Sequence, residues 1–266
     1  MASHRSKSHT VVPAPCIAQH FRDQLRIARA SAFRDAEGFQ EILFVIERLG
    51  FMLTNNPEAR TLDKYKPKIQ KLSENSVLAE EIPASWRHLH TPMSELYEIV
   101  RIARNDALHQ GALARHLTAH AVELALVLED ALMDGSNKVS DFMIRDVLIA
   151  YEWQPISFVR QQMLINSYSY IPLQRQKNVT PKWYLISDYN LARCIPSDRK
   201  KKKQRYLQTI KDVLKSGDLD IEQADSCEAD TTVEEARRML NNKPLLVTHK
   251  SEPDQILGII TAFDLL

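Results

Sequence analysis

The sequence has few cysteines, no long apolar segment and almost no net charge, and each of these absences excludes a class of protein. Only three cysteines occur in 266 residues, Cys16, Cys194 and Cys227, and none belongs to a CxxC pair. We therefore expect reduced thiols in a cytoplasmic protein, rather than a disulfide framework or a zinc site. No apolar run approaches the ~20 residues that a membrane-spanning helix needs, so no membrane partner is expected. The formal net charge of +1 means that a nucleic acid would have to be bound by a local basic patch.

What the chain does contain is typical of a folded globular protein. It is 44% hydrophobic and 26% charged, which argues against wholesale disorder. Its length predicts about two domains. The first residues, MASHRSKSHT, are polar and basic and are followed by no apolar stretch, so they predict no secretory signal. We expect residues 1–13 to form a disordered arm.

Helical periodicity dominates residues 14–135. Apolar residues recur there at three- and four-residue steps, which predicts an all-α helical bundle. The expected helices cover about residues 15–30, 39–53, 63–74 and 92–133. Gly111 is expected to bend or break the last of them, because glycine weakens a helix interior by ~1 kcal/mol. Asp134-Gly135-Ser136-Asn137 ends this helix and predicts a linker.

Residues 139–266 contain one supersecondary pattern twice, in residues 139–195 and 206–266. Each copy has a helix, a strand, a turn, a second strand and a short helix. Matching residues support the repeat: Met163 and Met239, Pro172 and Pro244, and the groups SDYN (187–190) and TAFD (261–264). Two such copies predict two similar units that pack together. The expected fold class is therefore an α+β multidomain chain, in which an all-α bundle precedes an α/β tandem pair.

A run of positive charge separates the two copies. Residues 196–205 read PSDRKKKKQR and predict a solvated basic linker. The lysines at 200–203 leave a second interpretation open, in which they contact RNA.

The second copy resembles a CBS domain. The family pattern D-x-T-V-x-E-A-x-x-M appears at residues 230–239, P-L-L-V at 244–247 and G-I-I-T-x-x-D-L at 258–265. The first copy is a degenerate match, because Arg160 replaces the helix alanine and Tyr184 or Leu185 replaces the strand glycine. The resemblance covers about residues 139–266. It implies a tandem CBS module that binds an adenosine compound, with ATP, ADP or AMP as the regulatory ligand.

The strand-end groups supply the candidate nucleotide-binding residues, Thr261 and Asp264 in the second copy and Ser187 and Asn190 in the first. A carboxylate such as that of Asp264 can accept hydrogen bonds from both ribose hydroxyls, while a Thr or Ser hydroxyl and helix N–H groups contact a phosphate. Asn190 brings no charge. Both pairs also suit a helix cap that needs no ligand, and this alternative stays open.

The stretch RNDALH (104–109) carries three residue types suited to RNA cleavage without a metal. Asn105 and His109 lie one turn apart on a helix face, and Arg104 is displaced by about 140° from His109. His109 can take the proton of a 2′-hydroxyl. Arg104 can stabilise the charge that grows on the phosphoryl oxygens, and Asn105 can orient the histidine or hold the phosphate.

Arg-polar-x-x-x-His late in an all-α domain resembles the HEPN family, over about residues 14–135. The resemblance implies a metal-independent endoribonuclease that acts as a homodimer or higher oligomer, and the products would carry 2′,3′-cyclic phosphate and 5′-hydroxyl ends. Arg104, Asn105 and His109 are then the candidate catalytic residues, with no catalytic cofactor. Arg101 and Arg115 are candidate RNA contacts. An ordinary helix face, with Arg104 paired to an acid, explains the same residues without catalysis.

His116 and His120 lie one turn apart with Glu123 nearby, a spacing that could hold a metal ion. The pattern lacks the glutamate of H-E-x-x-H, so no metal is expected.

The two resemblances together predict a ribonuclease gated by an adenine nucleotide, of a kind that would suit a toxin or an anti-phage effector. The nucleotide would bind one arrangement of the dimer better than another. The alternative is a non-enzymatic adenine-nucleotide sensor whose helical domain serves as a dimerisation or docking platform. A third option is a protein that binds RNA without cutting it.

Overall fold

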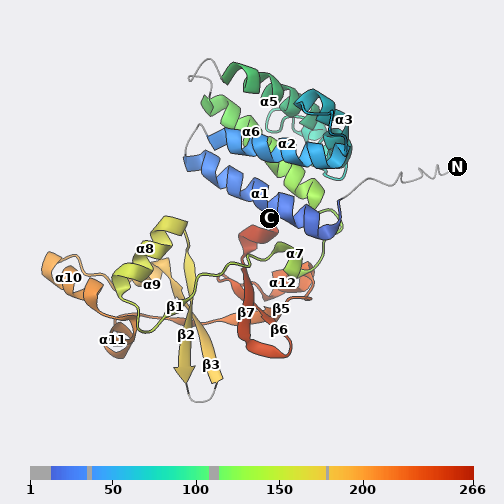
Figure 1. The fold of residues 1–266 in the computed structure, drawn as a ribbon. Coiled ribbons are helices and arrows are strands. Elements are labelled where there is room, and N and C mark those ends of the chain that lie inside the picture. The colour runs from blue at the N-terminus through green and yellow to red at the C-terminus, as the bar shows by residue number, and fades with distance from the viewer. Residues whose placement is uncertain (1–12, 35–37, 108–113, 178–179) are drawn as a thin grey trace. The chain divides into compact units, whose positions relative to one another are not determined.

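The computed structural model describes residues 13–34, 38–107, 114–177 and 180–266 (Figure 1). The side chains of residues 105–116, 176–182 and 253 lie outside this description. The chain divides into two compact units, Met1–Ser136 and Asn137–Leu266. None of the described helices is long and apolar enough to cross a membrane.

The first unit is helical throughout its described part. Its elements are α1 (Pro15–Arg34), α2 (Phe39–Thr54), α3 (Leu62–Ser73), α4 (Glu81–Ser85), α5 (Met93–Ala107) and α6 (Ala114–Leu132). Helix α2 packs against α1, α3 and α6, and α5 packs against α3 and α6. The segment predicted as one helix over residues 92–133 contains both α5 and α6, and Gly111 lies outside the described residues.

Apolar residues at helical spacing form the core of this unit. Ile42, Ile46 and Leu49 follow one face of α2 and are completely buried. Arg29 of α1 and Glu129 of α6 form a two-pronged ion pair within the packing, with Nε–Oε1 at 2.6 Å and Nη2–Oε2 at 2.9 Å. Because each charge has its partner, the pair can be largely buried without leaving an uncompensated ion.

The second unit repeats one order of elements, as the sequence predicts. The first repeat has β1 (Ala150–Tyr151), α8 (Ile156–Asn166), β2 (Tyr170–Lys177), β3 (Thr180–Ser187) and α9 (Asp188–Arg193). The second has β5 (Asp225–Glu228), α12 (Val233–Met239), β6 (Leu245–His249), β7 (Glu252–Ile260) and the 3-10 helix η2 (Ala262–Leu265). In each sheet a parallel pair (β1 with β2, β5 with β6) is followed by an antiparallel pair (β2 with β3, β6 with β7).

A short helix leads into each repeat and packs on the other one. Val139, the first residue of α7 (Val139–Phe142), donates its N–H to the carbonyl of Thr231 at 2.9 Å, just before α12. Ile210, the first residue of α11 (Ile210–Lys215), donates to the carbonyl of Gln154 at 2.9 Å, just before α8. This reciprocal exchange ties the two repeats into one unit.

The predicted basic linker contains a helix, α10 (Arg199–Leu207). The Asp198 carboxylate caps it by accepting the N–H of Lys201 at 2.9 Å. The Arg160 guanidinium of α8 lies 5.7 Å from the centre of the Tyr206 ring, which holds the helix against α8.

Candidate functional site

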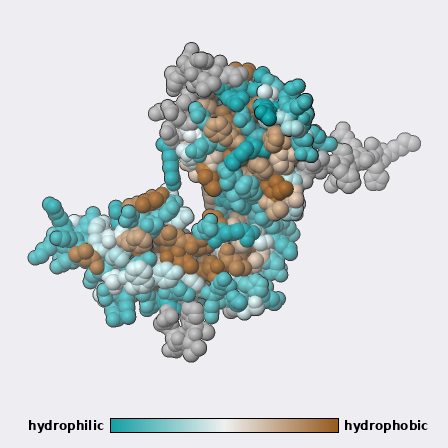
Figure 2. All heavy atoms as spheres, viewed as in Figure 1, coloured by the Kyte–Doolittle hydropathy of each residue, from teal (hydrophilic) through white to brown (hydrophobic). Residues whose placement is uncertain are grey.

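A cavity of about 580 Å³ lies in the second unit where both repeats meet. It is lined by the segment between α7 and β1, by the loops that follow α8 and α12, and by the end of β7 with the start of η2. Apolar side chains form most of its wall: Ile144, Val147, Leu148, Pro172, Pro244, Ile259 and Phe263. Figure 2 shows apolar residues gathered across the middle of this unit, with hydrophilic residues around them. The volume falls in the ~300–1,000 Å³ range of small-molecule sites.

Gly258 of β7 allows the segment after α7 to pass close to this strand and to form one wall of the cavity. A Cβ at Gly258 would stand 2.7 Å from Met143 Sδ and 2.8 Å from the carbonyl oxygen of Ile144, closer than any side chain permits. Ile144 and Ile259 exchange two backbone hydrogen bonds, both 2.9 Å long. The missing side chain therefore lets the segment after α7 cross β7 and reach the cavity.

Thr261 and Asp264, predicted as one nucleotide-binding pair, are brought together at the start of η2. The Thr261 hydroxyl and the Thr261 N–H both donate to Asp264 Oδ2 at 2.8 Å. This is a helix-capping arrangement. Thr261 lines the cavity, whereas the buried Asp264 lies behind it and is not part of the lining.

Ser187 and Asn190, the pair predicted in the first repeat, also adopt a cap. The Ser187 hydroxyl oxygen accepts the N–H of Asn190 at 3.1 Å and begins α9. Ser187 is only 5% exposed, and neither residue lines the cavity. Beside them the strand β4 (Glu222–Gln223) pairs with Tyr184 and Leu185 of β3. The two predicted sites are therefore not equivalent.

The charge at the cavity is sparse. Lys243 is the one cation among the residues that line it, and its Nζ lies 3.1 Å from Asp225 Oδ2 and donates to the carbonyl of Gln223 at 2.8 Å. Asp146 brings one carboxylate to the lining. The Tyr170 hydroxyl donates to the carbonyl of Asn242 at 2.9 Å, and burial raises the pKa of this phenol. A ligand would thus meet apolar walls and few charges.

In the helical unit, Arg104 is the predicted catalytic residue whose side chain the structure describes. Its Nη2 lies 2.7 Å from Glu47 Oε1 on α2, and its side chain remains 41% exposed. His109 lies outside the described residues, as does the side chain of Asn105. The ion pair places one guanidinium at the C-terminal end of α5, immediately before the segment that contains His109.

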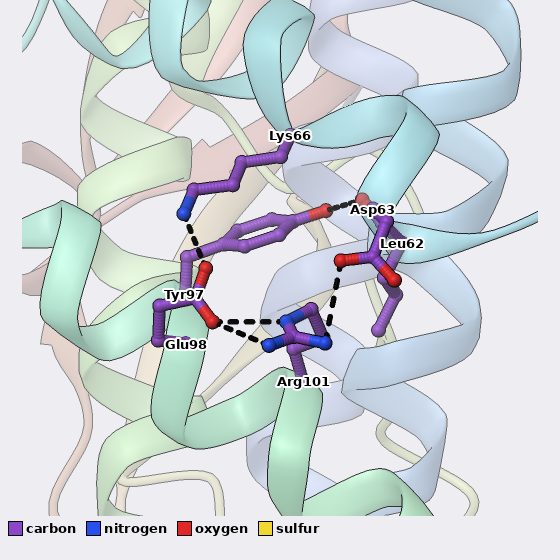
Figure 3. A network of polar contacts seen from close by, with 6 residues as sticks. All are labelled: Leu62, Asp63, Lys66, Tyr97, Glu98 and Arg101. Carbon is purple, nitrogen blue, oxygen red and sulfur yellow. Dashed lines mark hydrogen bonds and ion pairs between the residues drawn. The ribbon is translucent and has the colours of Figure 1, made fainter.

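Arg101, predicted as an RNA contact, is part of an ion-pair network on the helical unit (Figure 3). Its Nε and Nη2 donate to Glu98 Oε2 at 2.9 and 2.7 Å, and Nη1 lies 3.3 Å from Asp63 Oδ1. Lys66 bonds to the same Glu98, and the bonds from Lys66 and Arg101 lower the pKa of that carboxyl group. A phosphate would have to compete with two carboxylates for Arg101. The side chain of Arg115 lies outside the described residues.

Glu123, the carboxylate near the candidate metal ligands His116 and His120, has a structural role. Glu123 accepts the N–H of Thr91 at 2.8 Å, which ties α6 to the start of α5. No group of three metal-ligating side chains occurs among the described residues, which do not include the side chain of His116.

No protein-family model matches the chain, and no curated protein matches its sequence. Solved structures of CBS-domain proteins do match about half of it. CBSX2 from Arabidopsis thaliana is 16% identical with a TM-score of 0.37, and covers 48% of this chain and 90% of its own. A structure of CBSX2 in complex with AMP is 18% identical, with a TM-score of 0.36 and coverages of 48% and 92%. A CBS-domain protein from Agrobacterium tumefaciens is 11% identical, with a TM-score of 0.36 and coverages of 49% and 91%.

Several residues at the cavity carried no signal in the sequence. Lys243 and the other residues of the loop after α12 lie in a polar turn that no motif distinguishes. A weak signal for the exchanged helices did exist, because Asp141 and Asp212 each accept the backbone N–H of the residue three positions earlier, at the start of α7 and α11. That repeat would have shown which segments lead into the two copies.

Proposed function

We propose that the second unit binds an adenine nucleotide in the cavity beside Thr261. The observation that carries this proposal is the juxtaposition, in one cavity of about 580 Å³, of an apolar wall, the Thr261 hydroxyl and the Lys243 ammonium group. An apolar wall suits a purine ring, and a few placed polar groups suit a ribose and a phosphate. The sequence resemblance of Thr261 and Asp264 to the CBS pattern supports the same ligand. Asp264 would act through Thr261, because its carboxylate accepts a hydrogen bond from the Thr261 hydroxyl and so orients that hydroxyl.

Calorimetric titration of the full chain with AMP, ADP, ATP and GMP tests this proposal. Thr261→Val keeps the shape of the side chain and removes its hydroxyl. Thr232→Val is the matched control, because Thr232 makes the same capping arrangement with Glu235 at α12 and does not line the cavity. We expect Thr261→Val to weaken adenine-nucleotide binding about tenfold, the worth of one hydrogen bond, and Thr232→Val to leave it unchanged. Equal affinities in the two variants would contradict the proposed site.

We propose further that the helical unit is a metal-independent endoribonuclease of the HEPN type, working as a homodimer under nucleotide control. The specific support is Arg104, which Glu47 holds at the end of α5 with its guanidinium still partly exposed. It precedes His109 by five residues. Cleavage through the 2′-hydroxyl requires a cation that stabilises the phosphoryl charge and a base such as histidine. Arg104 would stabilise the phosphoryl charge, and His109 would accept the proton.

Cleavage of total RNA in EDTA, with and without AMP or ATP, tests the nuclease. We expect the protein to leave 2′,3′-cyclic phosphate ends, and His109→Ala to abolish cleavage. His88→Ala is the control, because His88 is an exposed histidine of the same unit. Circular dichroism must show that both variants fold. If RNA cleavage depends on AMP or ATP and Thr261→Val removes this dependence, nucleotide binding in the second unit regulates cleavage by the first.

The second candidate is a non-enzymatic adenine-nucleotide sensor. The ion pairs of Arg101 favour it, because this guanidinium group, a candidate RNA contact, is already bound to Glu98 and Asp63. Nucleotide binding without cleavage under any nucleotide would support the sensor against the nuclease.

A further inference from the structure

Helix α10 carries the strongest local charge in the described part of the chain. Arg199 to Lys203 are five consecutive cations, and all five residues are exposed. None of the five lies within ion-pair distance of a carboxylate among the described residues, whereas Arg205 of the same helix is paired to Asp218 at 2.7 Å. Cations one turn apart repel one another, and cations in the first turn of a helix oppose its dipole. Within the described ranges, Lys202 alone of the five has a favourable contact for its charge, with its Nζ 5.7 Å from the centre of the Tyr206 ring. The other cations repel one another, and binding of a polyanion would reduce that repulsion.

The helix lacks the apolar face that a membrane surface requires. None of its residues is buried, and its basic residues point to all sides of the helix. In Figure 2 the end of the unit that carries α10 is hydrophilic. An interfacial helix lays an apolar stripe into the lipid, so the helix is better suited to a phosphate backbone than to a bilayer.

Two exposed aromatic rings belong to the segment that pairs with the residues after α10. Tyr151 and Trp153 stack with their ring centres 6.5 Å apart and their planes 16° from parallel, and Trp153 is 70% exposed. Their segment is held to the residues that follow α10, because Lys211 donates its N–H to the carbonyl of Glu152 at 2.9 Å. Exposed aromatic rings next to a basic element are the combination that binds bases and phosphates of single strands.

We propose that Arg199–Lys203 with Tyr151 and Trp153, here called the basic surface, binds single-stranded nucleic acid. The cations of α10 contact the phosphates, and a base stacks on Trp153. Arg160 and Tyr206 hold the helix in place, so the surface is formed before the strand binds. This proposal goes beyond nucleotide binding and cleavage, and it holds whether or not the helical unit cuts RNA.

Fluorescence anisotropy of a labelled 20-nucleotide oligo(U) tests the proposal. It is measured with the full chain from about 50 to 200 mM KCl, in a His109→Ala background so that the proposed nuclease does not cut the probe. The variant Lys200→Gln/Lys201→Gln/Lys203→Gln removes three charges from α10. Lys64→Gln/Lys68→Gln/Lys250→Gln removes the same charge from exposed lysines elsewhere. We expect the first variant to lose at least tenfold in affinity at low salt. Its slope of log K against log salt should fall by about 2, because each phosphate contact on a single strand contributes about 0.7. The control should bind as the wild type.

Trp153→Ala separates stacking from charge. We expect about a tenfold loss of affinity with an unchanged salt slope, since the ring makes no ionic contact. Equal binding by the α10 variant and the control overturns the proposal, and so does preference for anionic vesicles over the oligonucleotide. Oligo(dT) and a duplex of equal length show which nucleic acid is preferred, and a preference for the duplex contradicts the stacking role of Trp153. His109→Ala separates this proposal from the proposed nuclease, because it should stop cleavage and leave oligo(U) binding intact.

Discussion

The two repeats of the second unit have the same order of strands and helices, but the hydroxyl residue after the last strand lines a cavity in one repeat and is buried in the other. In the second repeat, β7 has Gly258 where the segment after α7 crosses it, and Thr261 lines a cavity. In the first repeat, Tyr184 of β3 takes the place of Gly258, β4 pairs with β3 much as Ile144 pairs with β7, and Ser187 is buried. The difference teaches that a duplicated fold supplies two equivalent places, and that local side-chain volume and burial determine which strand-end hydroxyl lines a cavity.

Gly258→Val should have the largest effect, because it gives β7 a side chain where the first repeat has Tyr184. The added side chain would overlap the carbonyl oxygen of Ile144, a backbone atom that is itself hydrogen-bonded to β7. We expect a loss of about 3 kcal/mol in the free energy of unfolding of the second unit, at the upper end for overpacking, together with loss of nucleotide binding. Urea unfolding followed by tryptophan fluorescence in a Trp86→Phe background measures it, because Trp153 and Trp183 both belong to this unit.

Gln255→Val is the control for that measurement. Gln255 is an exposed residue of the same strand, so its replacement adds a valine to β7 without meeting the segment after α7. If Gly258→Val proved as stable as Gln255→Val, the close crossing of β7 would have no energetic importance.

The number of nucleotides bound per chain is the next test of the difference between the two repeats. If only the second repeat offers a site, titration calorimetry should give one nucleotide per chain. Ser187→Ala should leave the affinity unchanged, although loss of the α9 cap should cost roughly 1 kcal/mol of stability. Thr261→Val should weaken binding about tenfold. Two nucleotides per chain, or an affinity that falls with Ser187→Ala, would restore the first repeat as a binding site.

Much of this architecture is encoded in patterns that can be recognised in the sequence. The helical half follows from three- and four-residue periodicity, and the duplication follows from matching residues such as Pro172 and Pro244. The burial of Ser187 could not be foreseen, because it depends on tertiary packing around β3 and not on a local pattern. Helix α10 was expected to be part of a linker because its sequence has no apolar periodicity. Its position depends on contacts distant in sequence, between Tyr206 and Arg160 and between Arg205 and Asp218.

The candidate sites show the same limit. Thr261 and Asp264 lie together, as their spacing predicts, and form the cap that the sequence left open as an alternative. That only Thr261 lines the cavity depends on tertiary packing. The partner of Arg104 is Glu47, which is distant in sequence, and no local pattern could identify it. Sequence periodicity predicts which elements form, whereas long-range ion pairs depend on how these elements pack.

Lys243→Met tests whether Lys243 makes the proposed site in the cavity beside Thr261 prefer AMP to adenosine. Lys243 is the one cation lining the cavity and is shared with Asp225 and Gln223, so its attraction for a phosphate is partly offset. We expect AMP to bind about three- to tenfold more weakly to the variant, a loss of roughly 1 kcal/mol, and adenosine to bind as before. Lys250→Met, at an exposed lysine near Glu228, is the control. An equal loss for adenosine and AMP would mean that Lys243 acts through packing alone.

The smallest effect concerns the capping carboxylates of α11 and α12. Hydrogen bonds from the Thr232 hydroxyl and N–H lower the pKa of Glu235 below its ordinary 4.5, and those from Thr209 lower the pKa of Asp212 below 3.8. A lowered pKa in the folded state adds stability above the unfolded pKa, and this stability is lost as the pH falls through the folded value. Glu235→Gln should therefore flatten the fall of the urea midpoint below about pH 4.5, and Asp212→Asn should act at lower pH. Glu234→Gln, at the neighbouring exposed carboxylate, is the control. Identical pH profiles for Glu235→Gln and the wild type would show that the cap of α12 contributes no pH-dependent stability.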